Sequence, residues 1–268
     1  MKKTFKLFSL FAIAALAITS CTKDSGMSAA EEISDATLAK ISQQGFGTSN
    51  VQKIEEGYLV EGDIVLTEEF LNTTPGGNFL RIANNEQYRT TNLVNGPRVI
   101  TLSLDSKIAN KAGYPEALAE VARRYNAETL NLTFTVVSSG GNIVFSNANG
   151  SYLASAGFPT GGNPYGSVKV NTRAIGTGTS TTFINYLATI LAHEAGHCIG
   201  FRHTDYADRS FSCGGSTSNE GASTVGAIHI SGTPTGPDAG SWMLACIGSG
   251  QNRFFNNNDK VALGNLYP

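Results

Sequence analysis

Histidine is scarce in this chain, with only four among 268 residues. Charge is scarce as well: Asp, Glu, Lys and Arg together make up 15% of the sequence, and the formal net charge is only −2. Because no cluster of lysine or arginine is available to displace counterions from phosphates, the composition argues against a nucleic-acid-binding protein. Hydrophobic residues make up 41% of the chain, enough to bury a core, which argues against intrinsic disorder.

The N-terminus lacks an apolar run long enough to span a bilayer. Residues 7–18 are apolar but too few to cross one. Lys2 and Lys3 precede this stretch and give it the positive start of an export signal. We therefore expect the chain to be exported.

The residues ITSC at 18–21 resemble the lipobox of bacterial lipoproteins, in which cleavage leaves a lipid-bearing cysteine as the new N-terminus. We expect a signal peptide over 1–20, a lipid-modified Cys21 and a tether over 21–28. The protein would then be anchored at the bacterial outer membrane or cell surface, with release of a soluble mature form as a further option. An ordinary secretory signal is the alternative, since Ile18 stands where leucine is commoner.

Beyond Cys21 the chain has only three further cysteines. Export brings them into oxidising conditions, where two of the three can pair. Cys198 lies in an apolar stretch and is expected to pack as a small buried side chain. This favours a disulfide between Cys213 and Cys246.

Residues 29–86 differ from the remainder by their acidic character. The acidic side chains of this region include Glu55, Glu56, Glu61, Asp63, Glu68 and Glu69. A polar, turn-rich linker follows at 72–78, the kind of exposed stretch that proteases cut. Two interpretations stay open: a prosegment that is removed from a zymogen, or a small packed subdomain or spacer from the membrane.

From residue 87 to 268 the sequence alternates strand and helix patterns. Strands are expected at 98–105, 132–139, 142–147 and 166–172. An amphipathic helix is expected at 114–128, with Pro115 in its first turn, and a helix buried on most sides at 181–198.

Three of the four histidines fall within eleven residues, in HEAGHCIGFRH. On a helix, His193 and His197 project from one face and can hold one metal ion. Glu194 would lie beside that ion as a general base for water. Gly200 permits the left-handed conformation that ends a helix, so that His203 can supply a third nitrogen. Three nitrogens and an open fourth position are typical of one catalytic Zn²⁺.

The full pattern HExxHxxGxxH resembles that of the metzincin zinc endopeptidases. The longer string HEAGHCIGFRHTD is similar to that of the dual-action HEIGH metallopeptidases, with Ala195 where isoleucine is frequent. The resemblance covers about residues 87–268, and we take these as the catalytic domain. It implies an α+β, metzincin-like fold: a twisted mixed sheet and two long helices in an N-terminal subdomain, then a loop-rich C-terminal subdomain ending in a helix. It also implies a monomer that hydrolyses peptide bonds in peptides or proteins.

The same resemblance assigns roles in the C-terminal half. Met243, in GSWMLAC, would form the methionine-containing turn beneath the zinc. The final segment, FFNNNDKVALGNLYP, would form the last helix, with Asn258 as a candidate cap. Leu244 and Ala245 stand where some metzincins have a tyrosine near the zinc, so oxyanion stabilisation would fall mainly on the metal.

Resemblance to metzincins also implies where a substrate lies. The segment 150–159 resembles the edge strand that binds an extended peptide backbone to backbone. The candidate substrate-binding residues are Tyr152, Leu153, Ala154, Ser155 and Ala156. The pocket for the side chain after the scissile bond would be walled by the motif helix and by residues 226–242.

Other polar residues near the motif have more than one interpretation. Asp205 could orient His203 or Arg202, or serve a turn. His229 is expected to have no metal role. Because no cysteine lies between Cys21 and Cys198, a thiol cannot keep the zinc latent, and the acidic segment offers Asp63 as a candidate carboxylate instead.

Two further functions compete with a zinc endopeptidase. One is a non-catalytic, zinc-containing envelope lipoprotein that binds a polymer or a protein partner. Glu194 separates the two, because a binding protein does not need a carboxylate beside an open coordination position. The other is a zinc hydrolase that acts on non-peptide amides, and only the resemblance of the edge strand argues against it.

Overall fold

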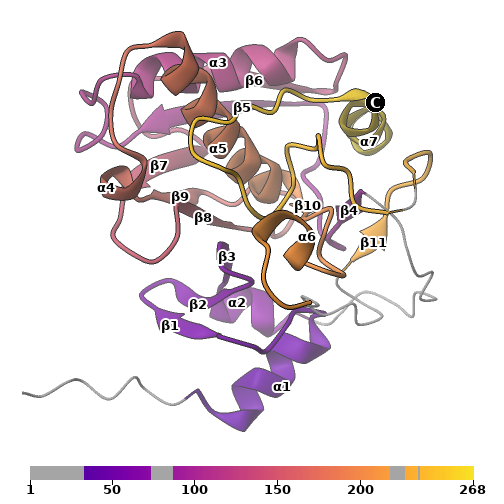
Figure 1. Ribbon diagram of the computed structural model, residues 1–268. Coiled ribbons are helices and arrows are strands. Elements are labelled where there is room, and N and C mark those ends of the chain that lie inside the picture. The colour runs from indigo at the N-terminus through magenta and orange to yellow at the C-terminus, as the bar shows by residue number, and fades with distance from the viewer. Residues whose placement is uncertain (1–32, 74–86, 218–226, 235) are drawn as a thin grey trace, which may run out of the picture. The chain divides into compact units, whose positions relative to one another are not determined.

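Five strands from residues 98–170 form one end of a mixed sheet (Figure 1). They are β5 (Arg98–Leu104), β6 (Leu132–Val136), β7 (Ile143–Asn147), β8 (Ala154–Gly157) and β9 (Ser167–Val170). Three pairs are parallel, β5 with β6, β5 with β7 and β7 with β9, whereas β8 pairs antiparallel with β9. The sequence predicts all five segments. It does not predict that β6 and β7, which follow each other, lie on opposite sides of β5.

In this computed structural model, residues 33–73, 87–217, 227–234 and 236–268 are described, and they belong to one folded unit, Ile33–Pro268. The signal peptide, Cys21, the tether and most of the linker lie outside the described residues. Within the described ranges, no helix combines the length and apolar character needed to cross a bilayer.

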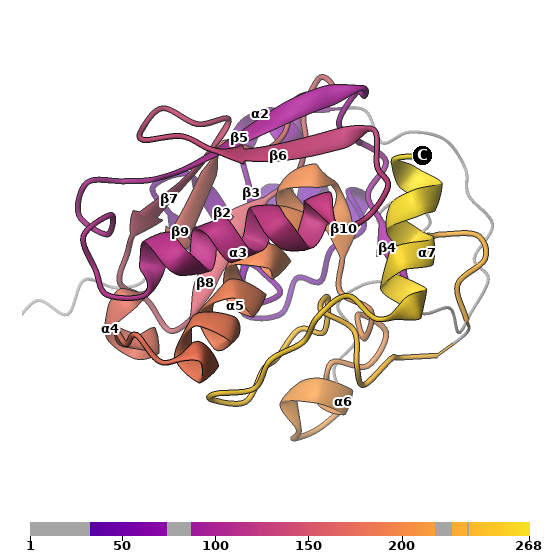
Figure 2. The same cartoon turned by 90° about the horizontal axis from the view of Figure 1, so that it is seen from above.

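Two long helices pack against the sheet, as Figure 2 shows. Helix α3 (Tyr114–Asn126) covers β5 and β6, and α5 (Thr181–Ile199) contacts β8 and α3. Both helices supply large apolar side chains to one core. Within it, the Tyr125 ring stacks on Phe134 at 4.3 Å and its hydroxyl donates to the Ala192 carbonyl at 2.8 Å. The expected combination of a mixed sheet with two long helices is confirmed.

Helix α5 begins and ends where its sequence dictates. The Ser180 hydroxyl caps its first turn by accepting from the Phe183 N–H. Its last residue is followed by Gly200 with φ +116°, a conformation that glycine adopts without strain. A side chain at this position would also collide with the Asn92 carbonyl oxygen, at 2.9 Å from its Cβ. The chain therefore turns back sharply after the helix.

Residues 33–73, here called the N-terminal segment, form a packed layer beside β8. Their elements are α1 (Asp35–Gln43), β1 (Gln52–Ile54), β2 (Gly57–Val60), β3 (Ile64–Leu66) and α2 (Glu68–Leu71). Strand β3 pairs parallel with β8, so the three short strands extend the sheet to the order β1-β2-β3-β8-β9-β7-β5-β6. The segment has a second apolar cluster that includes Phe46, Phe70 and, from the strand side, Phe158. Each buried large apolar side chain contributes roughly 1.5–3 kcal/mol, so this segment is folded rather than an extended spacer.

The C-terminal part is rich in loops and ends in a helix, as expected. A small second sheet joins distant positions in the order β10-β4-β11 and was not predicted. The strands of this sheet are β4 (Tyr88–Arg89), β10 (Phe201–Arg202) and β11 (Ile228–His229). The remaining helices are the short α4 (Thr172–Ile175) and α6 (Ser210–Cys213) and the last helix, α7 (Asn257–Leu266).

The cap of α7 is Asn256, so the expectation of Asn258 was wrong. Asn256 accepts from the N–H groups of Asn258 and Asp259, and the Asp259 carboxylate accepts from the Asn256 N–H. This reciprocal capping box satisfies donors at the helix start, whereas Asn258 already lies inside the first turn.

Candidate metal centre

The three histidines of the motif converge on one point. His193 and His197 lie one turn apart on α5, and the sharp turn at Gly200 returns the chain so that His203 faces them. The Nε2 atom of His197 lies 3.0 Å from that of His193 and 3.2 Å from that of His203. All three side chains are buried.

Backbone carbonyls fix the tautomers of two of these rings. His193 Nδ1 lies 2.8 Å from the Trp242 carbonyl oxygen, and His197 Nδ1 lies 2.7 Å from that of Phe201. Since a carbonyl only accepts, each Nδ1 carries the proton and each Nε2 presents a lone pair to the other ring. Burial, together with the other two histidines, lowers the pKa of His197 well below its ordinary value and keeps it neutral. Lone pairs that face each other at such short range fit a shared cation, and neutral imidazole nitrogens suit zinc.

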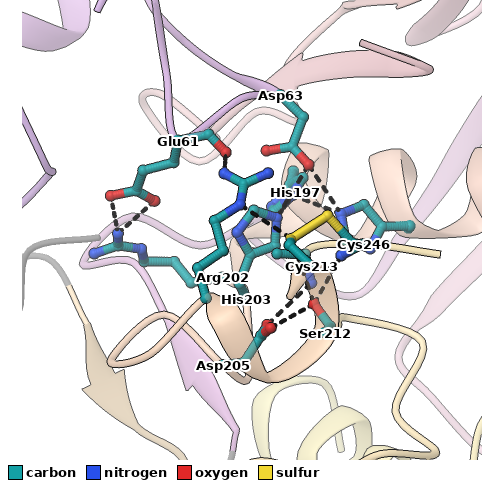
Figure 3. A network of polar contacts seen from close by, with 12 residues as sticks. Glu61, Asp63, His197, Arg202, His203, Asp205, Ser212, Cys213 and Cys246 are labelled. Atoms are coloured by element: carbon teal, nitrogen blue, oxygen red, sulfur yellow. Dashed lines mark hydrogen bonds and ion pairs between the residues drawn. A yellow bond between two sulfur atoms is a disulfide. The ribbon is translucent and has the colours of Figure 1, made fainter. Parts of the chain in front are cut away.

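Asp63 completes the cluster with a carboxylate from the N-terminal segment (Figure 3). Its Oδ2 lies 3.2 Å from His203 Nε2 and 3.7 Å from His193 Nε2. Burial alone would raise the pKa of Asp63, but the nearby histidines lower it well below its usual range. Its buried Oδ1 accepts no hydrogen bond from any described residue. An ionised, partly unsatisfied carboxylate beside three nitrogens also fits a metal ion, so the sequence-based candidate lies at the centre.

Glu194 lies beside the histidines without joining the cluster. It is almost fully buried, and its Oε2 has no hydrogen-bond partner among the described residues. Burial, and then the negative charge of Asp63, raise the pKa of the Glu194 carboxyl well above its ordinary value. The carboxyl group lines a cavity of about 270 Å³ next to the metal ligands.

The methionine-containing turn lies beneath the motif helix, at the place expected for Met243. A Cβ at Gly196 would come within 2.7 Å of the Met243 sulfur and 3.2 Å of Trp242 Nε1. The glycine in HEAGH therefore allows the turn to pack directly against the helix. The Met243 carbonyl accepts from the Thr204 N–H at 2.9 Å, which ties the turn to the residue after the third histidine.

The Asp205 carboxylate joins the segment after Met243 to the segment that contains Ser212. It accepts from the Ser212 hydroxyl at 2.5 Å and from the Ala245 N–H at 3.0 Å. Cys213 and Cys246, the expected pair, are joined by a disulfide next to these contacts, and Cys198 is buried and unpaired. His229 contacts Thr233 Oγ1 at 3.0 Å and lies outside the cluster.

The expected position of the pocket wall was only partly right. The motif helix lines the cavity through Thr189, Ile190, His193 and Glu194, as predicted. Of the described part of 226–242, however, only Trp242 reaches it. The remaining wall comes from residues 244–247 and from Arg253, because Asp205 and the disulfide draw that segment over α5.

The strand expected to bind substrate is covered by the N-terminal segment. Of the five candidate residues, Tyr152, Leu153 and Ala154 line the cavity, whereas Ser155 and Ala156 do not line it and are fully buried. Ile64 pairs with Ala156 in a parallel register, and the Ala156 N–H donates to the Asp63 carbonyl at 2.9 Å. The segment thus occupies the edge of β8 and places Asp63 at the histidines at the same time.

A buried ion pair holds the same segment, and sequence reasoning missed it. The Arg202 guanidinium, fully buried, lies 2.7 Å from both carboxylate oxygens of Glu61 and donates to the Gly45 carbonyl at 3.0 Å (Figure 3). The same group stacks over Phe46 at 4.3 Å. Two signals were available in the sequence: an arginine between Gly200 and His203 of the motif, and an acidic segment upstream. Neither of them specifies this pairing.

Comparison with solved structures gives two myroilysin chains and a fish hatching enzyme. The first myroilysin structure is 16% identical, with a TM-score of 0.42, and the match covers 68% of this chain and 98% of the myroilysin chain. The second is 14% identical, with a TM-score of 0.40, and the match covers 91% of this chain and 100% of the myroilysin chain. The zinc-protease high choriolytic enzyme 1 of the medaka fish Oryzias latipes is 15% identical (TM-score 0.36), with 63% and 88%. Comparison with curated protein sequences gives no match.

A family model matches most of the chain. The model, described as "Dual-action HEIGH metallo-peptidase", matches residues 58–267. It therefore includes β2 and β3 of the N-terminal segment as well as the region from residue 87 on, where the sequence resemblance was expected to begin. Because that match spans well over half of the sequence, the chain belongs to the dual-action HEIGH metallo-peptidase family and is a metallopeptidase that uses a single zinc ion.

Proposed function

We propose that this metallopeptidase is an endopeptidase in which Glu194 is the general base. The observation that carries the proposal is the place of this carboxyl group: it is buried, lacks a hydrogen-bond partner at Oε2 among the described residues, and shares a cavity with His193. Zinc, when bound to His193, His197 and His203, acts as a Lewis acid toward a scissile carbonyl and lowers the pKa of water to about 7.

Glu194 then moves one proton in two steps. It takes the proton from the attacking water and later delivers it to the leaving amine, which requires a carboxyl group that is near the metal without being a ligand. The carbonyls of Trp242 and Phe201 keep the two helical imidazoles in the orientation that leaves Nε2 for the metal. A substrate bound in extended form would pair with the edge of β8, at residues 152–156.

We also propose that the chain is a zymogen in which the N-terminal segment blocks both parts of this site. Strand β3 covers the edge where substrate would pair, and Asp63 presents a carboxylate to the zinc ligands. Zinc accepts carboxylate oxygen as a fourth ligand, so Asp63 would close the open coordination position. Removal or displacement of residues 33–73 would then open it.

Glu194→Gln tests the catalytic proposal. The protein would be the exported chain from residue 22, intact and after limited trypsin digestion, which can cut after Arg81, between the linker and residue 87. We expect about one zinc per chain in all samples and a loss of cleavage of an unstructured protein of about 100- to 10,000-fold in the variant. Glu116→Gln, an exposed carboxylate on α3, serves as the matched control and should leave both unchanged.

Two results would contradict the proposal. If Glu194→Gln cuts as fast as the unmutated protein, another group is the base. If zinc is bound but the unmutated protein cuts no peptide before or after trypsin treatment, the non-catalytic envelope-binder hypothesis or a non-peptide substrate takes its place.

A further inference from the structure

The cavity beside Glu194 contains a cationic group that the proposed chemistry does not use. Arg253 lines this cavity together with Ile190, Leu244 and Ile247, which are apolar. His193 and Glu194 line the same cavity, so a group bound in it would lie beside the reacting bond. A volume of about 270 Å³ accommodates one amino-acid side chain.

The backbone of Arg253 is fixed from both sides. Its N–H donates to the Thr189 hydroxyl at 3.1 Å, and its carbonyl accepts from the Arg124 guanidinium at 3.3 Å. Arg124 is itself buried and held by Glu120 at 2.9 Å. The position of the Arg253 side chain at the cavity wall therefore follows from α3 and α5, not from a surface loop alone.

The guanidinium of Arg253 has no ion-pair partner among the described residues. Its one hydrogen bond within the described residues runs from Nη1 to the neutral Cys246 carbonyl at 2.9 Å, and no described carboxylate lies within ion-pair distance of it. Partial burial lowers the pKa of Arg253, while Asp205 and Asp259 act in the opposite direction. Guanidinium groups have five N–H donors in a planar fork that matches a carboxylate, so most of this capacity is unused.

A second arginine at the cavity is engaged elsewhere. Arg209 also lines it, but its guanidinium donates to the Glu61 carbonyl of the N-terminal segment and to the sulfur of Cys213. Two acidic residues line the cavity, Glu194 and Asp63, and Asp63 belongs to that same segment. Once the segment has left, Arg209 loses its contact with Glu61, whereas Arg253 keeps its contacts with Thr189 and Arg124, so Arg253 is the cation whose position does not depend on the segment.

We infer that Arg253 makes this cavity a subsite for a carboxylate of the substrate. The carboxylate has two possible sources: the side chain of a Glu or Asp directly after the scissile bond, or the free C-terminus of a short peptide. This inference rests on the proposed peptidase function and specifies its substrate class. Arg253 is a specificity residue here and takes no part in the proton transfers.

Matched peptides test this inference on the substrate side. The zinc-loaded chain from residue 22 is digested with trypsin, the trypsin is inhibited, and kcat/KM is measured for blocked, C-terminally amidated peptides that differ only in carrying Glu or Gln after the cut. A hydrogen-bonded charge predicts a preference for Glu of roughly 10- to 100-fold. In a second set, the peptides end with the residue directly after the cut, and this residue has either a free or an amidated C-terminus. If only this second set shows a preference, for the free C-terminus, the terminal carboxylate is the group that binds.

Variants of the arginine test it on the protein side. Arg253→Met should reduce the preference to about one while peptides with an apolar residue at this position are still cut, and Arg253→Lys should keep part of it. The fold should survive, because the contacts with Thr189 and Arg124 use the backbone of Arg253; zinc content and thermal melting check this.

The inference is overturned if acidic and neutral peptides are cut equally in both sets, if Arg253→Met keeps the preference, or if Arg209→Met rather than Arg253→Met abolishes it. In each of these cases peptides are still cut, so the peptidase proposal survives. If the unmutated protein cuts no peptide at all, both fail together.

Discussion

At the scale of single residues, Asp259 joins three distant parts of the chain. Its Oδ1 accepts from Gln87 Nε2 at 2.6 Å and from the Ser241 hydroxyl at 2.7 Å. Its Oδ2 accepts from the Asn256 N–H at 3.0 Å and from the Trp242 N–H at 3.3 Å. The same carboxyl group therefore caps α7, holds the turn beneath the metal centre and fixes the start of β4.

This carboxyl group predicts a pH-dependent component of stability. Burial raises the pKa of Asp259 to about 7, against the opposing effect of its hydrogen-bond donors. Since the unfolded chain releases this proton near pH 4, the native state binds more protons between about pH 4 and pH 7. Its contribution to the free energy of unfolding is therefore present at low pH and is lost as the pH rises to about 7, by at most about 4 kcal/mol.

Urea unfolding at pH 5 and pH 8 measures this component. Asp259→Asn should lower stability at both pH values, because an amide cannot accept all four hydrogen bonds, but should reduce the fall in stability between them. Glu116→Gln provides a comparison, since that carboxylate is exposed on α3. An Asp259→Asn variant with the same pH dependence as the unmutated chain would contradict the assignment.

At the scale of elements, the proposed latency depends on the contact between the N-terminal segment and the remainder of the chain. The segment is held by β3–β8 pairing, by the Glu61–Arg202 ion pair and by Asp63 at the histidines. Removing one partner of a buried ion pair costs about 3–5 kcal/mol, because the other charge stays buried without compensation. That cost corresponds to roughly 100-fold or more in the equilibrium between a closed and an open segment.

Two substitutions should therefore activate the intact chain. Glu61→Gln leaves Arg202 without its ion pair, and Asp63→Asn removes the anionic ligand from the metal centre. We expect both to raise peptide cleavage by the intact chain, by about 10-fold or more, and to leave the rate after trypsin digestion unchanged. Glu55→Gln, an exposed change in the same segment, is the control. Equal rates for the intact unmutated chain and for its digested catalytic region, separated from the N-terminal segment by gel filtration, would mean that the segment does not inhibit.

Local patterns predicted elements and the zinc ligands, but not long-range pairing. Helix α5 was expected at 181–198 and spans 181–199, because its apolar pattern, its Ser180 cap and Gly200 are all local signals. The helix geometry also fixed the relation of His193 to His197 and Glu194. A local signal was available for α7 too. In a capping box an acidic residue lies three positions after the cap, so Asp259 identifies Asn256 as the cap.

The cavity wall illustrates why the remainder could not be predicted. Residues 244–247 reach the cavity because Asp205 binds the Ala245 N–H, 40 positions away, and because a disulfide closes 33 residues. The pairing of β3 with β8 and that of Glu61 with Arg202 span still longer separations, the latter 141 positions. Such contacts depend on the path of the whole chain, and no residue spacing encodes them.

At the scale of the whole molecule, the proposed lipid anchor and the proposed zymogen are linked by one stretch of chain. Cys21 precedes the N-terminal segment, and the metal ligands follow residues 72–86, which begin with the linker, so a cut within this stretch separates the anchor from the catalytic region covalently. The two fragments would still share β3–β8 pairing and a buried ion pair. A cut alone is therefore insufficient for release, which also needs the N-terminal segment to dissociate.

This predicts a membrane-bound, nicked intermediate. In cells that produce the chain, we expect a fragment beginning near residue 87 to remain in the membrane fraction together with the lipid-modified N-terminal fragment. This fragment should enter the soluble fraction faster in the Glu61→Gln variant than in the Glu55→Gln variant. N-terminal sequencing and mass spectrometry of both fractions measure this, and Cys21→Ala should make every form soluble because no acyl chain remains to hold it. A fully processed protein that still carries Cys21 on the catalytic region would exclude cleavage in the linker. A fragment that leaves the membrane at the same rate in both variants would show that the ion pair does not retain it.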